Sequence, residues 1–500
     1  MHWDLHISEK KDDYLLHIRI SIVLKIPCFL QGIFLYLIYY ILCSGDFMAL
    51  LLRNVNYAVT CDKTDTVYEG VDILIDDGRI QAIGIDLDVG AEQVINCTNM
   101  ICYPGLINTH HHLYQIFSRN IPSVQNMELF PWLKSLYGVW KNLDNEVVYL
   151  SSQCGMAELM KNGCTTCFDH HYVFPQGRSG GLLEAQLEAA KELNIRMHMS
   201  RGSMNLSEKD GGLPPDSVVQ TTSEILKDSI EAIEKYHDAS FGSMNMLALA
   251  PCSPFSASSD LYKESAVLAR QYGVRLHTHL CETIDEENYT LEKFNKRPLE
   301  YMESLGFVGD DVWYAHGIHF TDAEVSYLAS TGTGVAHCPV SNMKLSSGVA
   351  KISQMLKKGV KVGLAVDGSA SNDGSNMLEE IRVAYLLSRL TYGSEGLTPY
   401  QVLKIATVGS AQVLGRDDIG SIEVGKCADM FLVDKRRVEL VGATFDPKSM
   451  LATVGLKGAV DYTIVNGKIT VENGRCVTID EEKLYEKADE KVKSYLSDLL

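Results

Sequence analysis

The middle of this 500-residue chain repeats one pattern, in which a short apolar run that predicts a β-strand precedes an amphipathic, helix-like stretch. Eight such units between residues 104 and 417 indicate a (β/α)8 TIM barrel, which typically needs ~250 residues before insertions. The predicted strands lie in the segments ICYPGLINTHHH, GCTTCFDHHY, IRMHMSRGSM, NMLALAPCSPFS, VRLHTHLCET, VWYAHGIHF, TGVAHCPVSN and KVGLAVDGSA.

A doubly wound open sheet is the alternative for a chain of alternating strands and helices. No G-x-G-x-x-G motif follows any of the predicted strands, and the chemically reactive residues are distributed over many strand ends. The barrel is therefore the favoured fold.

The two flanks of the barrel differ from it in pattern. Residues 48–103 and 418–480 read as short strands with turn signals such as Asp77-Gly78 and Asn466-Gly467. These flanks predict one small β-sandwich domain built from both chain ends. The polar, helix-periodic residues 481–500 predict a C-terminal helix.

The amino terminus carries an uncharged stretch over residues 26–45, which follows Arg19 and Lys25. Twenty uncharged residues could cross a bilayer as a tilted helix, so a membrane is an expected partner if this stretch is a genuine anchor. The alternative is that the apolar extension, residues 1–47, is not part of the mature chain, because Met48 opens a segment that reads as a complete first strand.

The composition narrows the classes of partner. Forty-five basic residues against 64 acidic ones give a net charge of −19, which opposes a nucleic-acid-binding surface. Thirteen cysteines form an odd set without a framework spacing, so we expect reduced thiols in a cytoplasmic protein.

Histidines and carboxylates gather at the ends of the predicted strands, where a barrel builds its active site. His110 and His112 are two apart at the end of the first strand, so both point to the same side. The remaining members are His277, His279 and Glu282 on the fifth strand, His316 on the sixth and Asp367 on the eighth. Imidazoles with one carboxylate are ligands that Zn²⁺ prefers.

Each of these residues has a structural explanation when taken alone, because a lone histidine at a strand end more often packs than binds metal. The ordered set of HxH, HxHxxE, histidine and aspartate argues against packing. Other histidines and one cysteine pair are expected to be structural: His170, His171, His198, His237, His319, Cys164 and Cys167.

The segments PGLINTHHHLYQ, HTHLCE, YAHGIH, HCPVSN and VDGSASNDGSN resemble the amidohydrolase superfamily, within its branch of purine and triazine deaminases and chlorohydrolases. The resemblance covers nearly everything after Met48, including GSIEVGKCADMFLVD. It implies a metal held by His110, His112, His279 and Asp367. The fourth strand, NMLALAPCSPFS, lacks the lysine of two-metal members, so we expect one divalent metal per chain: zinc, with iron or manganese as alternatives.

The resemblance also implies roles in hydrolysis. A metal of this kind lowers the pKa of a bound water to about 7. Glu282 would transfer protons to a ring nitrogen and then to the departing ammonia, while Asp367 would take the proton from the attacking water. His316 would polarise or orient that water.

For the substrate, the resemblance is greatest to 8-oxoguanine deaminases and implies conversion of that purine base to urate and ammonia. Gln115 and Arg201 occupy the places of residues that hold the purine by hydrogen bonds, and Trp132 could stack on the ring. Guanine and isocytosine-type or hydroxytriazine rings remain alternatives. Barrels of this branch commonly associate, which implies a homo-oligomer.

A hypothesis of a different class is a non-catalytic barrel that acts as a binding module. It predicts the loss of at least one metal ligand or of the acid. The sequence retains the complete set, which disfavours this class: His110, His112, His279, Glu282, His316 and Asp367.

Overall fold

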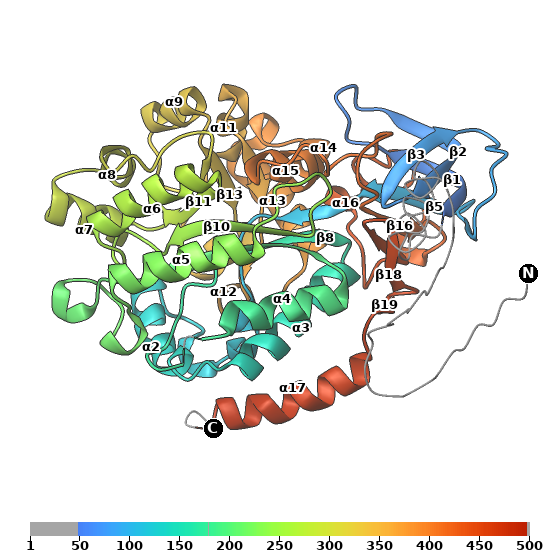
Figure 1. The fold of residues 1–500 in the computed structure, drawn as a ribbon. Coiled ribbons are helices and arrows are strands. Elements are labelled where there is room, and N and C mark those ends of the chain that lie inside the picture. Colours follow the sequence, from blue (N-terminus) through green and yellow to red (C-terminus); the bar gives the residue numbers. More distant parts are fainter. Residues whose placement is uncertain (1–48, 179, 498–500) are drawn as a thin grey trace, which may run out of the picture. The chain divides into compact units, whose positions relative to one another are not determined.

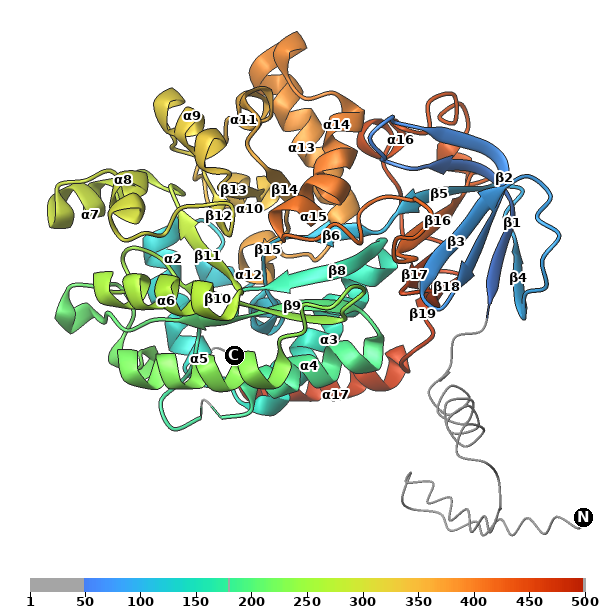
Figure 2. The same cartoon turned by 45° about the horizontal axis from the view of Figure 1, so that its top comes forward.

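The computed structural model describes residues 49–178 and 180–497, which belong to one compact unit spanning residues 48–500. Parallel strands run through its centre (Figure 1), and Figure 2 labels all eight, whose order is β14-β13-β12-β11-β10-β9-β8-β6. They are β6 (Leu106–Asn108), β8 (Cys164–Asp169), β9 (Arg196–Ser203), β10 (Asn245–Pro251), β11 (Arg275–Leu280), β12 (Val312–His316), β13 (Gly334–His337) and β14 (Val362–Leu364).

The first and eighth strands meet and close the barrel. Thr109 N donates a hydrogen bond to Leu364 O at 3.1 Å. Just beyond, β7 (His111–His112) pairs in parallel with β15 (Asp367–Gly368), and Asp367 N donates to His110 O at 3.1 Å. Closure therefore brings the histidines of the first strand beside the aspartate of the eighth.

Helices surround the strands (Figure 2). Sequence signals set several of their ends: Thr221 with Glu224, and Thr321 with Glu324, form capping boxes that satisfy free N–H groups of the first turn. The longer helices are α2 (Leu129–Trp140), α3 (Asn145–Lys161), α4 (Leu182–Leu193), α5 (Thr222–Tyr236), α6 (Ser259–Tyr272), α7 (Ile284–Phe294), α9 (Asp322–Thr331), α13 (Met377–Tyr392) and α17 (Glu481–Tyr495). The shorter ones are α8 (Pro298–Ser304), α10 (Pro339–Lys344), α11 (Ile352–Lys358), α12 (Ser369–Asn372), α14 (Pro399–Lys404), α15 (Ser410–Val413) and α16 (Met450–Thr453).

The second sheet draws its strands from both flanks of the barrel, in the order β19-β18-β17-β16-β5-β1-β2-β3, with β4 on β1. Ile80 N donates to Lys426 O, so the β3 edge returns to the segment before β16 and the sheet folds around its own apolar core. Its strands are β1 (Leu50–Val59), β2 (Val67–Asp76), β3 (Arg79–Gly84), β4 (Gln93–Asn96), β5 (Met100–Pro104), β16 (Met430–Asp434), β17 (Tyr462–Val465), β18 (Lys468–Glu472) and β19 (Arg475–Cys476). The predicted (β/α)8 barrel is confirmed, and the mixed sheet built from both flanks is consistent with the predicted small β-sandwich domain.

An apolar cluster occupies part of the barrel interior below the strand ends, next to the buried imidazoles of His198 and His277. Side chains from alternate strands meet there, as they do in barrels generally. This cluster includes Ile107, Phe168, Ala248, Trp313 and Ala336.

In residues 49–178 and 180–497, no helix is long and apolar enough to cross a membrane. The predicted apolar extension, residues 1–47, with its uncharged stretch at 26–45, lies outside the described residues.

A buried ion pair joins the sheet domain to the barrel. Arg196, at the start of β9, donates from Nε to Asp429 Oδ2 at 2.6 Å and from Nη2 to Asp429 Oδ1 at 3.0 Å. Both side chains are almost fully buried. Such a bidentate pair depends on both partners, because either one alone would be a buried charge without compensation.

We therefore predict that Arg196→Met lowers the free energy of unfolding by about 3–5 kcal/mol, because it leaves the Asp429 carboxylate buried and unpaired. The double variant Arg196→Met/Asp429→Leu should recover much of this loss. Denaturant unfolding measures both. Lys235→Met, which breaks an exposed pair with Glu184, is the control and should leave the midpoint unchanged. An equal effect of Arg196→Met and Lys235→Met would contradict the prediction.

Candidate active site

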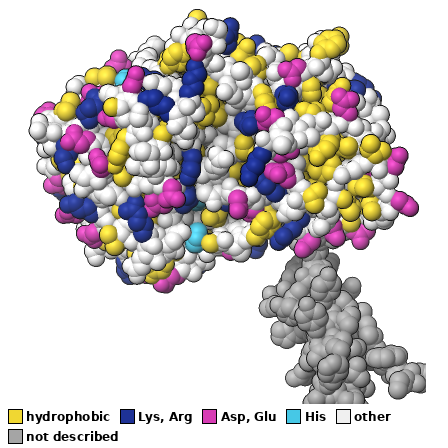
Figure 3. Space-filling view, turned by 90° about the horizontal axis from the view of Figure 1, so that it is seen from above, with side chains coloured by type: hydrophobic (Ala, Val, Ile, Leu, Met, Phe, Trp, Pro, Cys, Tyr) yellow, Lys and Arg dark blue, Asp and Glu magenta, His cyan; other side chains and the backbone are white. Residues whose placement is uncertain are grey.

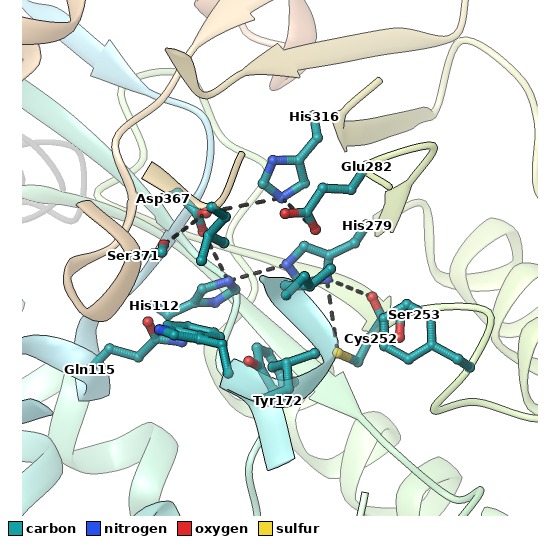
Figure 4. A pocket seen from close by; sticks show the side chains of 15 residues that line it. His112, Gln115, Tyr172, Cys252, Ser253, His279, Glu282, His316, Asp367 and Ser371 are labelled. Carbon is teal, nitrogen blue, oxygen red and sulfur yellow. Dashed lines mark hydrogen bonds and ion pairs between the residues drawn. The ribbon is translucent and has the colours of Figure 1, made fainter. Parts of the chain in front are cut away.

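Most of the described histidines are buried, and the face in Figure 3 shows little imidazole among its interspersed acidic and basic side chains. Several of them meet at a pocket at the carboxyl ends of the barrel strands (Figure 4). The space free of protein atoms at this pocket is about 380 Å³, which includes its opening to solvent. Its lining comprises His112, Gln115, Leu129, Trp132, Leu133, Tyr172, Cys252, Ser253, Phe255, His279, Glu282, His316, Leu345, Asp367 and Ser371.

The four side chains predicted as metal ligands lie together. Asp367 Oδ1 lies 3.2 Å from the Nε2 atoms of both His110 and His112. His112 Nε2 lies 3.2 Å from His279 Nε2. In a tetrahedral site with metal–nitrogen bonds of about 2.0–2.1 Å, the ligand atoms stand about 3.3 Å apart, so these separations suit a single ion.

Hydrogen bonds to the main chain orient two of these imidazoles. His112 Nδ1 lies 2.8 Å from His170 O, and His279 Nδ1 lies 2.7 Å from Cys252 O. Carbonyl oxygens only accept, so each Nδ1 carries the hydrogen and each Nε2 of the neutral ring presents a lone pair. Two facing lone pairs cannot hydrogen-bond, whereas a cation between them would satisfy both.

The third imidazole, that of His110, also has a buried Nε2 atom without a hydrogen-bond partner among the described residues. Burial lowers the pKa of His110 to about 3, so the ring is neutral and can offer a lone pair. These buried nitrogens and the adjacent carboxylate fit a divalent metal ion.

The carboxylate of Asp367 is divided between two environments. Ser341 Oγ and Ser371 Oγ donate to Oδ2 at 2.6 and 3.2 Å. Oδ1 is left to face the histidines. Asp367 also has a φ of 65°, and His316 one of 72°, values that are uncommon for residues other than glycine and that mark where these two strands turn into the site.

Glu282 and His316 lie beside the proposed ligands. Glu282 Oε2 lies 3.5 Å from His316 Nε2, which is 4.0 Å from Asp367 Oδ2. Burial raises the pKa of Glu282 above its ordinary value, although His316 opposes this effect. Burial disfavours charge on His316, but the carboxylates of Glu282 and Asp367 outweigh it and raise the pKa of His316. These groups form a buried acid–base pair.

The loop that carries Glu282 is held by a second carboxylate. Glu286, in the first turn of α7, accepts hydrogen bonds from Cys281 N at 2.9 Å and Glu282 N at 3.0 Å. His316 Nδ1 lies 2.8 Å from Asn342 Oδ1, which fixes its ring. The acid–base pair is thus positioned by neighbours that do not themselves line the pocket.

Two of the three predicted substrate contacts line the pocket. Gln115, in the 3-10 segment η1 (Leu113–Ser118), has both amide atoms buried without partners in the described part of the chain. Trp132 on α2 lines the pocket with its indole Nε1 also unpartnered there. Both side chains therefore have hydrogen-bonding capacity left for a ligand.

Arg201, the third predicted substrate contact, already has partners within the protein. It is not among the residues that line the pocket. Its guanidinium donates to Gly202 O, to Gln220 Oε1 at 2.7 Å and to Asp228 Oδ2 at 3.2 Å, and it stacks over Phe174. These neighbours fix the guanidinium within the protein, and a contact between Arg201 and the substrate stays a prediction.

Sequence reasoning missed other residues of this site. His170, assigned a structural place, lies within reach of the same ion as His110, His112 and His279. Its Nε2 lies 3.0 Å from Ala250 O, while Nδ1 has no partner in the described chain. Tyr172, Cys252, Ser253 and Ser371 also line the pocket. All of these follow predicted strands closely, and that position was the available signal.

A barrel with imidazoles and carboxylates converging at the carboxyl ends of its strands defines a metal-dependent hydrolase. A sequence model of the Amidohydrolase family matches residues 101–470, and the chain belongs to this family. It is a hydrolase of the deaminase and aminohydrolase class within the deaminase and chlorohydrolase branch, as predicted.

Individual relatives agree with this assignment. The chain is 44% identical to the 8-oxoguanine deaminase of Pseudomonas aeruginosa over 82% of this chain and 91% of that protein. It is 43% identical to the hydroxydechloroatrazine ethylaminohydrolase of Pseudomonas sp. strain ADP over 88% and 94%. The crystal structure of an atrazine chlorohydrolase from Arthrobacter aurescens TC1, complexed with zinc, superposes with a TM-score of 0.86 at 32% identity, covering 89% of this chain and all of that one.

We predict that His112→Ala reduces bound zinc to well below one ion per chain, because the variant removes one of the converging nitrogens. Inductively coupled plasma mass spectrometry of protein equilibrated with zinc measures this. The control is His319→Ala, since His319 Nε2 bonds Ser347 O outside the pocket. Equal zinc content in both variants would contradict the proposed ligand set.

Proposed function

We propose that this enzyme hydrolyses the 2-amino group of 8-oxoguanine and releases urate and ammonia. The reaction would use one divalent metal ion per chain, for which zinc is the first candidate. The observation that carries the proposal is the 44% identity to an 8-oxoguanine deaminase over most of both chains. A metal fits the site because His110, His112 and His279 converge with Asp367 at ligand-like separations.

The pocket supports a small flat ring as substrate. Its lining combines apolar and aromatic side chains with a few polar groups, as is usual in sites for small ring compounds. The unpartnered amide of Gln115 can donate to a ring carbonyl and accept from an adjacent ring N–H in a paired arrangement. Trp132 supplies a flat aromatic wall for the ring.

A hydroxytriazine aminohydrolase is the second candidate, because the relative that acts on hydroxydechloroatrazine is 43% identical over a slightly longer alignment. Guanine is the alternative purine. All three substrates would place an exocyclic amine on a carbon next to a ring nitrogen, so the same acid–base pair serves each of them.

When bound, the metal lowers the pKa of a coordinated water from about 16 to about 7 and so supplies a nucleophile at neutral pH. Asp367, through its carboxylate, accepts the proton of the attacking water. Glu282, held at the end of the fifth strand, carries a proton to the ring nitrogen beside the reacting carbon and then to the leaving ammonia. His316, 3.5 Å from Glu282, orients the attacking water. Such proton transfers contribute typically 10²–10⁴-fold.

Glu282→Gln tests the proton-transfer role. The variant keeps the size of the side chain but cannot deliver a proton, so we predict a fall in kcat of about 10²–10⁴-fold with unchanged zinc content and unchanged Tm. Steady-state kinetics, metal analysis and thermal unfolding measure the three. Glu184→Gln on the outer surface is the matched control. Undiminished turnover by Glu282→Gln would remove this assignment.

The substrate is tested by direct competition. We predict that kcat/KM for 8-oxoguanine exceeds that for guanine and for hydroxytriazines carrying an alkylamine, as followed by ammonia or alkylamine release. A preference for a hydroxytriazine would favour the second candidate, and a preference for guanine would favour the alternative purine. Gln115→Leu should raise KM for the preferred ring while leaving the zinc content unchanged.

A further inference from the structure

The three imidazoles proposed as metal ligands are held in two different ways. His112 and His279 each direct Nδ1 at a main-chain carbonyl, which is always an acceptor. His110 instead directs Nδ1 at another imidazole, with 2.8 Å between His110 Nδ1 and His277 Nε2. Since an imidazole nitrogen can donate or accept, the orientation of the proton on His110 depends on the tautomer of His277.

The surroundings of His277 determine that tautomer. His277 Nδ1 lies 3.0 Å from Trp313 O, which can only accept, so Nδ1 carries the hydrogen and Nε2 is an acceptor. His110 Nδ1 must then be the donor of the bond between the two rings. The consequence is that His110 Nε2 presents its lone pair to His112, His279 and Asp367.

The ring of His277 is fixed by packing as well as by this bond. It is fully buried, with its centroid 4.5 Å from that of Trp313 and 4.9 Å from that of Phe168. Trp313 also donates from its indole Nε1 to Thr109 O at 3.2 Å, directly before His110 in the chain. One tryptophan therefore braces both His277 and the backbone that carries His110.

We propose that His277 is a positioning residue of the metal centre, which holds His110 in the tautomer whose Nε2 lone pair faces the ion. This inference rests on the proposed metal site. Without an acceptor at His277, the alternative tautomer of His110 directs an Nε2–H at Asp367 Oδ1, 3.2 Å away. That hydrogen bond would occupy two ligands at once, and a metal ion would have to break it in order to bind.

The test compares zinc affinity, measured by competition with a chromophoric chelator, among variants of the full chain. His277→Leu removes the acceptor and should weaken zinc binding about 10–100-fold, the usual range for loss of a partner behind a metal ligand. His277→Gln can return an acceptor oxygen near the position of Nε2 and should restore most of the affinity.

His198→Leu is the matched control. His198 is another buried imidazole inside the same barrel, near Phe168 and Trp313, and its ring nitrogens have no partner in the described chain. The His198→Leu variant should bind zinc with the affinity of the wild-type protein. Unchanged affinity in His277→Leu would overturn the proposal. Equal losses in His277→Leu, His277→Gln and His198→Leu would also overturn it, since they would indicate a general packing effect.

Two further measurements test the tautomer of His110 and its role as a metal ligand. In metal-free wild-type protein labelled with ¹⁵N-histidine, His110 should carry its proton on Nδ1, and a proton on Nε2 would contradict the inference. The variant His110→Ala distinguishes failure of the positioning role of His277 from failure of the proposed ligand set. If it loses zinc while His277→Leu retains it, the positioning role alone fails; if it retains zinc, the proposed ligand set fails with it.

Discussion

The meeting of the first and eighth strands is the constraint on which the site depends. Asp367 and His110 lie more than 250 residues apart in the chain, and the hydrogen bond from Asp367 N to His110 O places their side chains at one edge of the barrel. A barrel has no sheet edge at which this register could slip. This pairing brings Asp367 Oδ1 within 3.2 Å of Nε2 of both His110 and His112.

The site combines polar groups that would be costly to bury singly, and each is oriented by a partner. Main-chain carbonyls fix His112 and His279, while serine hydroxyls occupy one oxygen of Asp367. The ring of His110 is oriented by its hydrogen bond with His277. The remaining lone pairs converge beside Glu282 and His316, and this arrangement fits the proposed metal site.

Much of the fold was predictable because its signals are local. Apolar runs, turn pairs such as Asp77-Gly78 and capping residues such as Thr221 act within a few residues, so strand and helix positions followed from them. The convergence of His110, His112, His279 and Asp367 followed from their places at strand ends. Their roles, and that of Glu282, remain predictions that the proposed experiments test.

The sequence by itself determined the eight-unit order and which histidines of the HxH and HxHxxE spacings share a face, because strand periodicity is local. The resemblance of its motifs indicated the family. Tertiary structure decided the rest. Asp228 and Gln220 are the hydrogen-bond partners of Arg201, and the proton positions behind His110 depend on Trp313 and His277, which the barrel brings beside the first strand. Hydrogen-bond partners of buried groups are chosen in three dimensions, and linear spacing carries no record of that choice.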